Sequence, residues 1–237
     1  MPLNYVRALT ATQRSARANL HLGVALAFVA GAANAGGFLA VGQFTSHMTG
    51  IVSMMAEHAA VGATGLVLGG AGALLSFVAG AACSAMMVNF ARRRRMRSQF
   101  ALPLLFEAVL LLAFGVLGAR LASVEAFFVP LTVMLLCFMM GLQNAVITKL
   151  SRAEIRTTHV TGLMTDIGIE LGRMMYWRDL GANRRLGVLV LLAGGFFAGG
   201  VAGALGFHHL GYLSTVPLAL LLVGLAIVPA LDDLRSR

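Results

Sequence analysis

The chain has 237 residues, of which 59% are hydrophobic and only 11% are charged, and its mean hydropathy is +0.85. Soluble domains carry about 25% charged residues, so this composition excludes an ordinary soluble fold and indicates a membrane protein. The net charge of +9 does not point to nucleic acid, because the arginines cluster at the ends of apolar segments, as membrane topology requires.

Six apolar segments are long enough to cross a bilayer, which takes about 20 helical residues. In chain order they cover about 19–41, 64–90, 101–119, 126–147, 185–206 and 213–231. Two shorter stretches, about 50–62 and 162–176, remain between them. A helix of 13 residues is only about 20 Å long, so neither short stretch is expected to cross alone.

A polar phrase, T-x-H-x-T-G, occurs immediately before each short stretch. The first copy reads TSHMTG at 45–50 and the second reads TTHVTG at 157–162. A duplicated phrase inside apolar sequence is typical of transporters and channels in which two related halves build one site.

The basic residues decide how the short stretches are oriented. If neither of them crosses, both termini and the 92–97 and 148–185 regions are cytoplasmic, and only Arg120 among the 18 Lys and Arg residues lies outside. If both crossed, the arginine run at 92–97 would face outside, against the positive-inside rule. The charge pattern therefore favours two re-entrant half-helices.

Each half then has three spans, so the halves are inverted relative to one another. We predict an all-α polytopic inner-membrane protein with six transmembrane helices and two re-entrant half-helices in inverted 3+3 repeats. Its membrane domain covers 19–231, with repeats at about 19–119 and 126–231, and the tails 1–18 and 232–237 are cytoplasmic. Both half-helices would point their N-termini at the membrane centre, with Thr49 and Thr161 as N-caps.

A candidate solute site follows from this meeting of the two phrases. Asn34 and Asn144 lie at matching positions of the two halves, and Arg156 directly precedes the second phrase. The predicted binding residues are Thr45, His47, Thr49, Gly50, Thr157, His159, Thr161, Gly162, Asn34, Asn144 and Arg156.

Ionisable residues inside apolar segments are costly and need a reason. Asp166, His159, His47 and Glu107 are the candidates for carrying protons. For both histidines the alternative is a structural hydrogen bond that braces the re-entrant loop, and the two interpretations stay open.

Two further acids have a structural alternative of their own. Glu107 could pair with the arginines at 92–97, and Glu170 could pair with Arg173 one turn along.

We expect transport of a small polar or anionic solute, with proton coupling as an open option. The alternatives are a passive channel and, from another class, a non-transporting scaffold or lipid-handling protein. Nucleotide loops, zinc-protease motifs and nucleophile elbows are lacking in the sequence, so we expect neither an enzyme nor a cofactor nor a metal. The expected partners are the lipid bilayer and a small molecule or ion, without nucleic acid, and a homo-oligomer stays open.

Two stretches carry a resemblance to a known family. GAANAGGFLAVGQFTSHMTG and MGLQNAVITKLSRAEIRTTHVTGLMTDIG resemble the YoaK-type family of bacterial inner-membrane proteins, a domain-of-unknown-function family numbered 1275, over about 19–231. The resemblance implies an architecture and no substrate. Relatives commonly have an acid where this chain has Asn34, and Asn where it has Ile51, so these positions depart from the family pattern.

Overall fold

The computed structural model describes residue 9 and residues 15–96, 98–121, 125–150, 158–177 and 180–235. Within these ranges the chain is helical and forms no sheet. The long helices are α2 (Ala16–Val41), α4 (Thr64–Arg93), α5 (Ala101–Leu121), α6 (Glu125–Leu150), α8 (Leu180–Leu210) and α9 (Thr215–Arg235). Each of them coincides with one predicted apolar segment, so the predicted helix positions are confirmed.

Five stretches of the described chain are long and apolar enough to cross a membrane. The last, Arg184–Asp233, contains both α8 and α9, which are separated by the 3₁₀ turn η1 (Gly211–Ser214). Helix length and hydropathy therefore make the chain a multi-pass membrane protein.

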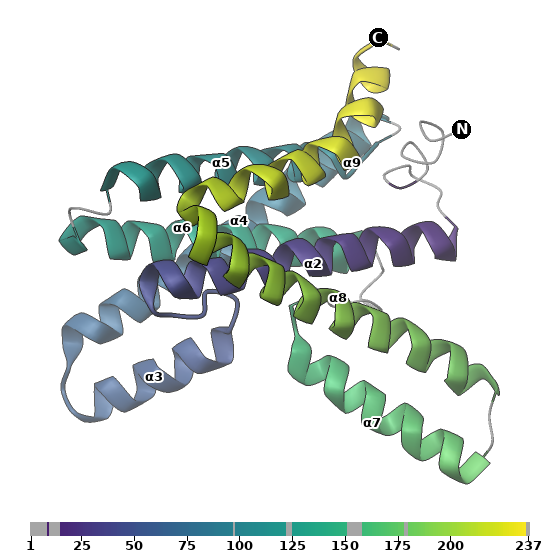
Figure 1. Ribbon diagram of the computed structural model, residues 1–237, viewed down its shortest axis with the longest axis horizontal. Coiled ribbons are helices and arrows are strands. Elements are labelled where there is room, and N and C mark those ends of the chain that lie inside the picture. Colours follow the sequence, from purple (N-terminus) through teal and green to yellow (C-terminus); the bar gives the residue numbers. More distant parts are fainter. Residues whose placement is uncertain are drawn as a thin grey trace.

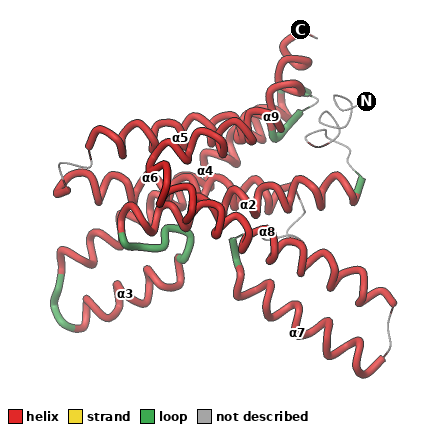
Figure 2. Tube along the Cα trace, in the orientation of Figure 1, coloured by secondary structure: helices red, strands yellow, loops and turns green. Residues whose placement is uncertain are grey.

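The two short stretches are also helices, α3 (Met48–Ala60) and α7 (Val160–Trp177). α3 packs on α4, and α7 packs on α8. In Figure 1 both short helices begin near the middle of the molecule, and their far ends point toward opposite sides. Figure 2 shows the green loop that brings the chain from the end of α2 back to the start of α3.

The long helices of the two halves interlock, because α2 packs on α8. A Cβ atom on Gly31 would overlap the carbonyl oxygen of Phe196, and one on Gly199 would overlap the carbonyl oxygen of Phe28. Such close approach of two backbones requires glycine on each helix.

The same contact recurs between α4 and α6. A Cβ atom on Gly80 would overlap the carbonyl oxygen of Phe138, and one on Gly141 would overlap that of Phe77. In both pairs a long helix of one half is therefore locked against a long helix of the other half.

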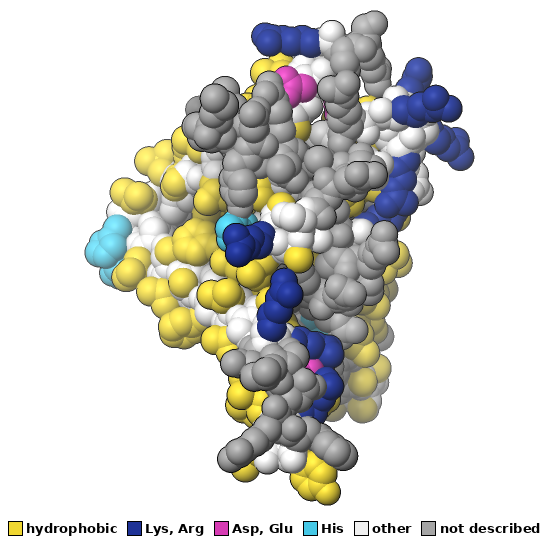
Figure 3. Space-filling view, turned by 90° about the vertical axis from the view of Figure 1, so that its right-hand side faces the viewer, with side chains coloured by type: hydrophobic (Ala, Val, Ile, Leu, Met, Phe, Trp, Pro, Cys, Tyr) yellow, Lys and Arg dark blue, Asp and Glu magenta, His cyan; other side chains and the backbone are white. Residues whose placement is uncertain are grey.

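A third pair, α5 and α9, runs side by side along the upper part of Figure 1. These two helices share one apolar core with α2 and α6, whose buried members include Leu22, Leu104, Leu136 and Leu222. The start of α2 and the end of α9 lie toward the same side of the molecule (Figure 1). Figure 3 looks onto this side, where Lys and Arg side chains gather.

Candidate functional site

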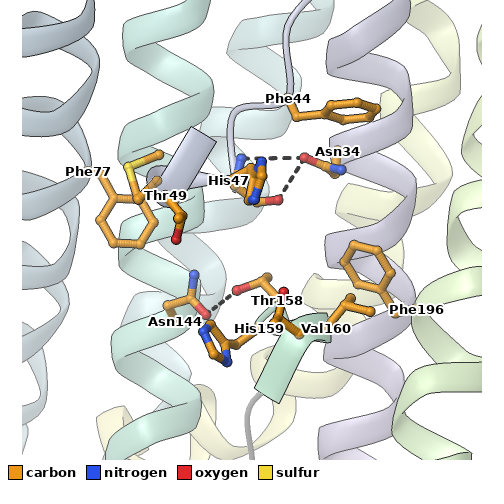
Figure 4. Close-up of a pocket in the computed structure, with 13 residues that line it drawn as sticks. Asn34, Phe44, His47, Thr49, Phe77, Asn144, Thr158, His159, Val160 and Phe196 are labelled. Atoms are coloured by element: carbon orange, nitrogen blue, oxygen red, sulfur yellow. Dashed lines mark hydrogen bonds between the residues drawn. The ribbon is translucent and has the colours of Figure 1, made fainter. Parts of the chain in front are cut away.

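The starts of the two short helices face each other across a cavity of about 430 Å³. Figure 4 shows side chains of the first phrase on one side of it and those of the second phrase on the other. The lining residues are Asn34, Phe44, Ser46, His47, Met48, Thr49, Phe77, Asn144, Thr158, His159, Val160, Thr161 and Phe196. Most of them form pairs at corresponding positions of the two halves.

An asparagine from the first helix of each half holds the phrase of that half in place. Ser46 donates to Oδ1 of Asn34 through its backbone N–H at 3.4 Å and its hydroxyl at 2.8 Å. In the second half the hydroxyl of Thr158 donates to Oδ1 of Asn144. The other end of the Asn144 amide donates to the Met140 carbonyl at 2.9 Å, which fixes its orientation. Each irregular loop is thus tied to a long helix of its own half.

The histidine of each phrase stands immediately before its short helix. α3 begins at Met48 and α7 at Val160, so His47 and His159 occupy the N-cap position. The prediction that Thr49 is the N-cap is therefore wrong, as is the same prediction for Thr161. Both threonines lie at the second helical position, because each helix starts two residues earlier than the phrase suggested.

His159 caps its helix with its ring. The backbone N–H of Gly162 donates to its Nδ1 at 3.1 Å. A nitrogen that accepts a hydrogen bond carries no proton, so Nε2 is the ring nitrogen that can donate. The ring of His47 has a related position, since a Cβ atom on Gly50 would lie 2.6 Å from Nδ1 of His47. The final glycine of the first phrase thus leaves room for the ring of its histidine.

First-turn amide groups at the cavity are unused. The amides of Met48 and Thr49 in α3, and of Val160 and Thr161 in α7, have no acceptor among the described residues, as at any helix start without a full set of caps. All four residues line the cavity. The lining includes no Asp, Glu, Lys or Arg among the described residues, so its polarity comes from imidazole, amide and hydroxyl groups and from the two helix starts.

The structure places six of the predicted binding residues at the cavity. They are Asn34, His47, Thr49, Asn144, His159 and Thr161. Gly50 and Gly162 lie one position further into their helices and do not line it.

Of the other three predicted binding residues only Thr45 is described, and it does not line the cavity. Thr45 is buried with 1% exposure, and its hydroxyl has no partner among the described residues. Arg156 and Thr157 lie outside the described residues.

The acids predicted from sequence lie away from the cavity. Asp166 is half-buried on α7 and is not among the lining residues. Glu170 is buried and pairs with Arg173 at 3.3 Å and with Arg185 on α8 at 3.2 Å, so its predicted pairing with Arg173 is confirmed. Glu107 is fully buried on α5, and neither of its oxygens has a hydrogen-bond partner among the described residues. The alternative that Glu107 pairs with the arginines that end α4 finds no support in the described part of that run.

The sequence did not lead us to two kinds of cavity residue, the hydroxyl residues at the second position of each phrase and the phenylalanines of the cavity wall. Ser46 and Thr158 occupy the variable second position of the phrase, and the shared hydroxyl was the signal that could have found them. Phe77 and Phe196 line the cavity from α4 and α8. They belong to the glycine contacts between the halves, and the repeat of Phe-x-Ala-Gly in both halves pointed to them.

A comparison with protein families gives a match over most of the chain. The sequence profile of a family described as "Protein of unknown function (DUF1275)" matches residues 22–228. No curated protein and no solved structure matches the chain.

Proposed function

The chain belongs to the DUF1275 family, and we propose that it is a membrane transporter for a small polar or anionic solute. The solute binds in the cavity between the two T-x-H-x-T-G phrases. One observation carries the proposal, namely that two irregular loops from opposite halves bring paired polar side chains and unused amides to one cavity. Polar groups of this kind inside a membrane bundle mark solute pathways.

The proposed topology has six spans in the inner membrane, two re-entrant half-helices, and inverted 3+3 repeats. The opposite directions of α3 and α7 in Figure 1 support the inversion. The gathering of basic side chains on the side where α2 begins and α9 ends supports cytoplasmic termini (Figure 3). The interlocked pairs α2–α8 and α4–α6 support equivalent roles for the two halves.

The hydrogen-bond balance of the cavity favours an electron-rich solute. Its strongest acceptors, Oδ1 of Asn34, Oδ1 of Asn144 and Nδ1 of His159, already accept hydrogen bonds from the protein. The groups left over are mostly donors, including the first-turn amides of both short helices. Helix starts add positive potential, and the described lining offers no carboxylate that would attract a cation.

The two rival functions differ from transport in structure or in flux. A scaffold would have a dry, tightly packed core between the two phrases. Here the polar residues of the phrases are at least partly exposed at the cavity, namely His47, Thr49, His159 and Thr161. A passive channel would give conductance and flux that does not saturate with solute, while a transporter saturates.

Purified protein in liposomes tests the proposal. The solutes are a panel of small anions (chloride, nitrate, formate, acetate, bicarbonate) together with urea and glycerol as neutral probes. We expect saturable uptake of at least one anion, and weaker apparent affinity in the Thr49→Val and Thr161→Val variants, which remove hydroxyls from the cavity.

Matched controls lie one turn along the same helices. Ser53→Ala on α3 and Thr165→Val on α7 alter exposed hydroxyl residues that do not line the cavity, and they should leave uptake unchanged. If no probe moves faster than in protein-free liposomes, and none shifts the thermal midpoint of the protein, the proposed function is wrong.

A further inference from the structure

A glutamate on α5 is buried in the protein core without a hydrogen-bond partner among the described residues. Glu107 has 0% exposure, and within the described part of the chain both of its carboxyl oxygens lack a hydrogen-bond partner. It lies between Leu104 and Leu111, two buried members of the apolar core that α5 shares with α2, α6 and α9. No basic side chain in the described part of the chain lies within hydrogen-bond distance of this carboxyl group.

An ionised carboxylate at this place would have no hydrogen-bond donor among the described residues. An ionised carboxylate in an apolar interior loses its hydration without compensation, and buried acids avoid this by keeping their proton. Even the neutral acid leaves a donor and an acceptor unsatisfied, which is rare in folded proteins. Inside a membrane such a residue is functional more often than structural.

Packing alone does not explain why residue 107 is a glutamate. Pro103 of α5 and Pro217 of α9 occupy corresponding positions of the two halves, and on that alignment the counterpart of Glu107 is Leu221. Leu221 packs against the same apolar core. A leucine thus suffices at this place in one half, while the other half retains an acid.

The charged groups on the neighbouring helices are engaged elsewhere or lie at the helix ends. On α6, Lys149 bonds to the Ala85 carbonyl and to Asn89 of α4. On α9, Asp233 accepts a hydrogen bond from the Ser98 amide at 2.9 Å.

The remaining charged groups also belong to helix ends. Arg92, near the end of α4, donates to Gln99 at 3.0 Å. The others on the elements packed against α5 are Arg93, Glu125, Asp232 and Arg235. The two oxygens of Glu107 receive no hydrogen bond from any of these groups.

We propose that Glu107 carries the proton that couples solute movement to the proton gradient, an inference that rests on the proposed transport function. The proton leaves the carboxyl oxygen for water, and returns from it, only when the core that α5 shares with α2, α6 and α9 opens, since the residue has no exposed surface here. Proton exchange thus requires a second conformation, in which the ionised carboxylate is hydrated. The proton is held in one conformation and exchanged with water in another. Proton exchange is therefore coupled to the conformational change that moves the solute.

The other ionisable candidates fit this role less well. Nδ1 of His159 is occupied as a helix cap. Asp166 is half-buried and His47 is exposed, so neither is enclosed by the helices as Glu107 is.

Proteoliposomes with an imposed pH gradient test the proposal, with the best anion of the solute panel as the probe. Wild type should accumulate the anion above its external concentration. Glu107→Gln should lose accumulation and still exchange labelled for unlabelled anion, because exchange does not require the proton to leave. Glu107→Leu, whose side chain the matching helix already carries, serves as a second variant if the glutamine variant folds poorly. Glu57→Gln, which changes an exposed acid on α3, is the matched control and should accumulate normally.

The outcomes separate the two proposals. Accumulation that survives in Glu107→Gln, or wild-type transport that ignores the gradient, overturns the role of Glu107 and leaves transport standing. Absence of any movement in wild type overturns transport and this inference together. A hydrophobic carbodiimide, which modifies protonated carboxyl groups in apolar surroundings, gives a readout without solute. Mass spectrometry should find the modification at Glu107, more slowly at alkaline than at acidic pH, and no modification there at any pH would also overturn the inference.

Discussion

The backbone amide of Gly162 donates a hydrogen bond to Nδ1 of His159 at 3.1 Å, so the histidine that opens α7 also caps it. This contact gives the histidine of the repeated phrase a structural role. It also leaves Nε2–H of the same ring as a donor beside the cavity. Bracing and solute contact can therefore belong to one side chain.

Two substitutions of His159 separate these roles. Asparagine is a good N-cap, so His159→Asn should keep the thermal midpoint near that of wild type, whereas His159→Leu should destabilise the fold by about 1 kcal/mol. If Nε2–H also binds the solute, both variants lose uptake. Thermal unfolding in detergent and uptake by liposomes, measured on the same preparations, check this. Equal stability of the two variants would remove the capping role.

Gly50→Ala tests the space that the first phrase reserves for its histidine. The new Cβ would lie 2.6 Å from Nδ1 of His47, which is closer than real contacts allow, so the ring must move out of its place at the start of α3. We expect a lower thermal midpoint and weaker uptake. Gly65→Ala on α4 is the control, because its Cβ meets nothing within 4 Å and alanine favours a helix by about 0.5–1 kcal/mol. A variant Gly50→Ala as active as Gly65→Ala would contradict this role of the glycine.

Gly199→Ala tests the interlocking of α2 and α8. Its Cβ would overlap backbone atoms of Phe28, which cannot rotate away, so the two helices must separate. Overpacking of this kind costs about 1–3 kcal/mol, or more where backbone is involved. Gly194→Ala on the same helix meets nothing within 4 Å and should behave like wild type. Thermal midpoint and monodispersity on size exclusion distinguish the pair.

Glu107→Leu should raise stability, whatever its effect on transport. The substitution removes two buried oxygens without partners, and relieving such a group is worth about 1–3 kcal/mol. The thermal midpoint should rise above that of wild type, and that of Glu107→Gln should stay close to it because the amide remains unpaired. A fall in both variants would mean that the carboxyl group has a partner that stabilises the fold.

Cysteine labelling tests the inverted topology. Val61, at the end of α3, is 74% exposed and Met175, near the end of α7, is 88% exposed. In a background without Cys83 and Cys137, Val61→Cys should react with a membrane-impermeant maleimide added outside intact cells. Met175→Cys should react only after the membrane is opened. Labelling of both positions from the same side would exclude the inversion.

The helix positions could be predicted because long apolar runs bounded by glycine and arginine almost always form spanning helices in a chain this apolar. The approach of the two phrases was also predictable, since helix length and the positive-inside rule together left little choice for α3 and α7. The N-caps could not be predicted in the same way. Threonine is the commoner cap, and only the backbone reveals that the helices start at Met48 and Val160, which gives the cap position to histidine.

Side-chain partners were predictable only where they are local. Glu170 and Arg173 are neighbours on one helix, so their pairing follows from spacing, whereas the contact of Glu170 with Arg185 depends on how α7 packs against α8. For Glu107 the sequence suggested a nearby arginine as partner. Instead, the orientation of α5 about its own axis places this residue in the core that the helices share, away from the arginines.

The crossed arrangement of the halves has a consequence for how the protein is made. When the ribosome has completed α2, α3 and α4, the close-packing surfaces around Gly31 and Gly80 still lack the helices that cover them, because α8 and α6 have yet to be synthesised. The helices of the first half therefore stay incompletely packed in the bilayer until the second half inserts and completes the assembly. Two separately expressed halves should accumulate together and be degraded when expressed singly, so the chain behaves in biogenesis as an obligate pair.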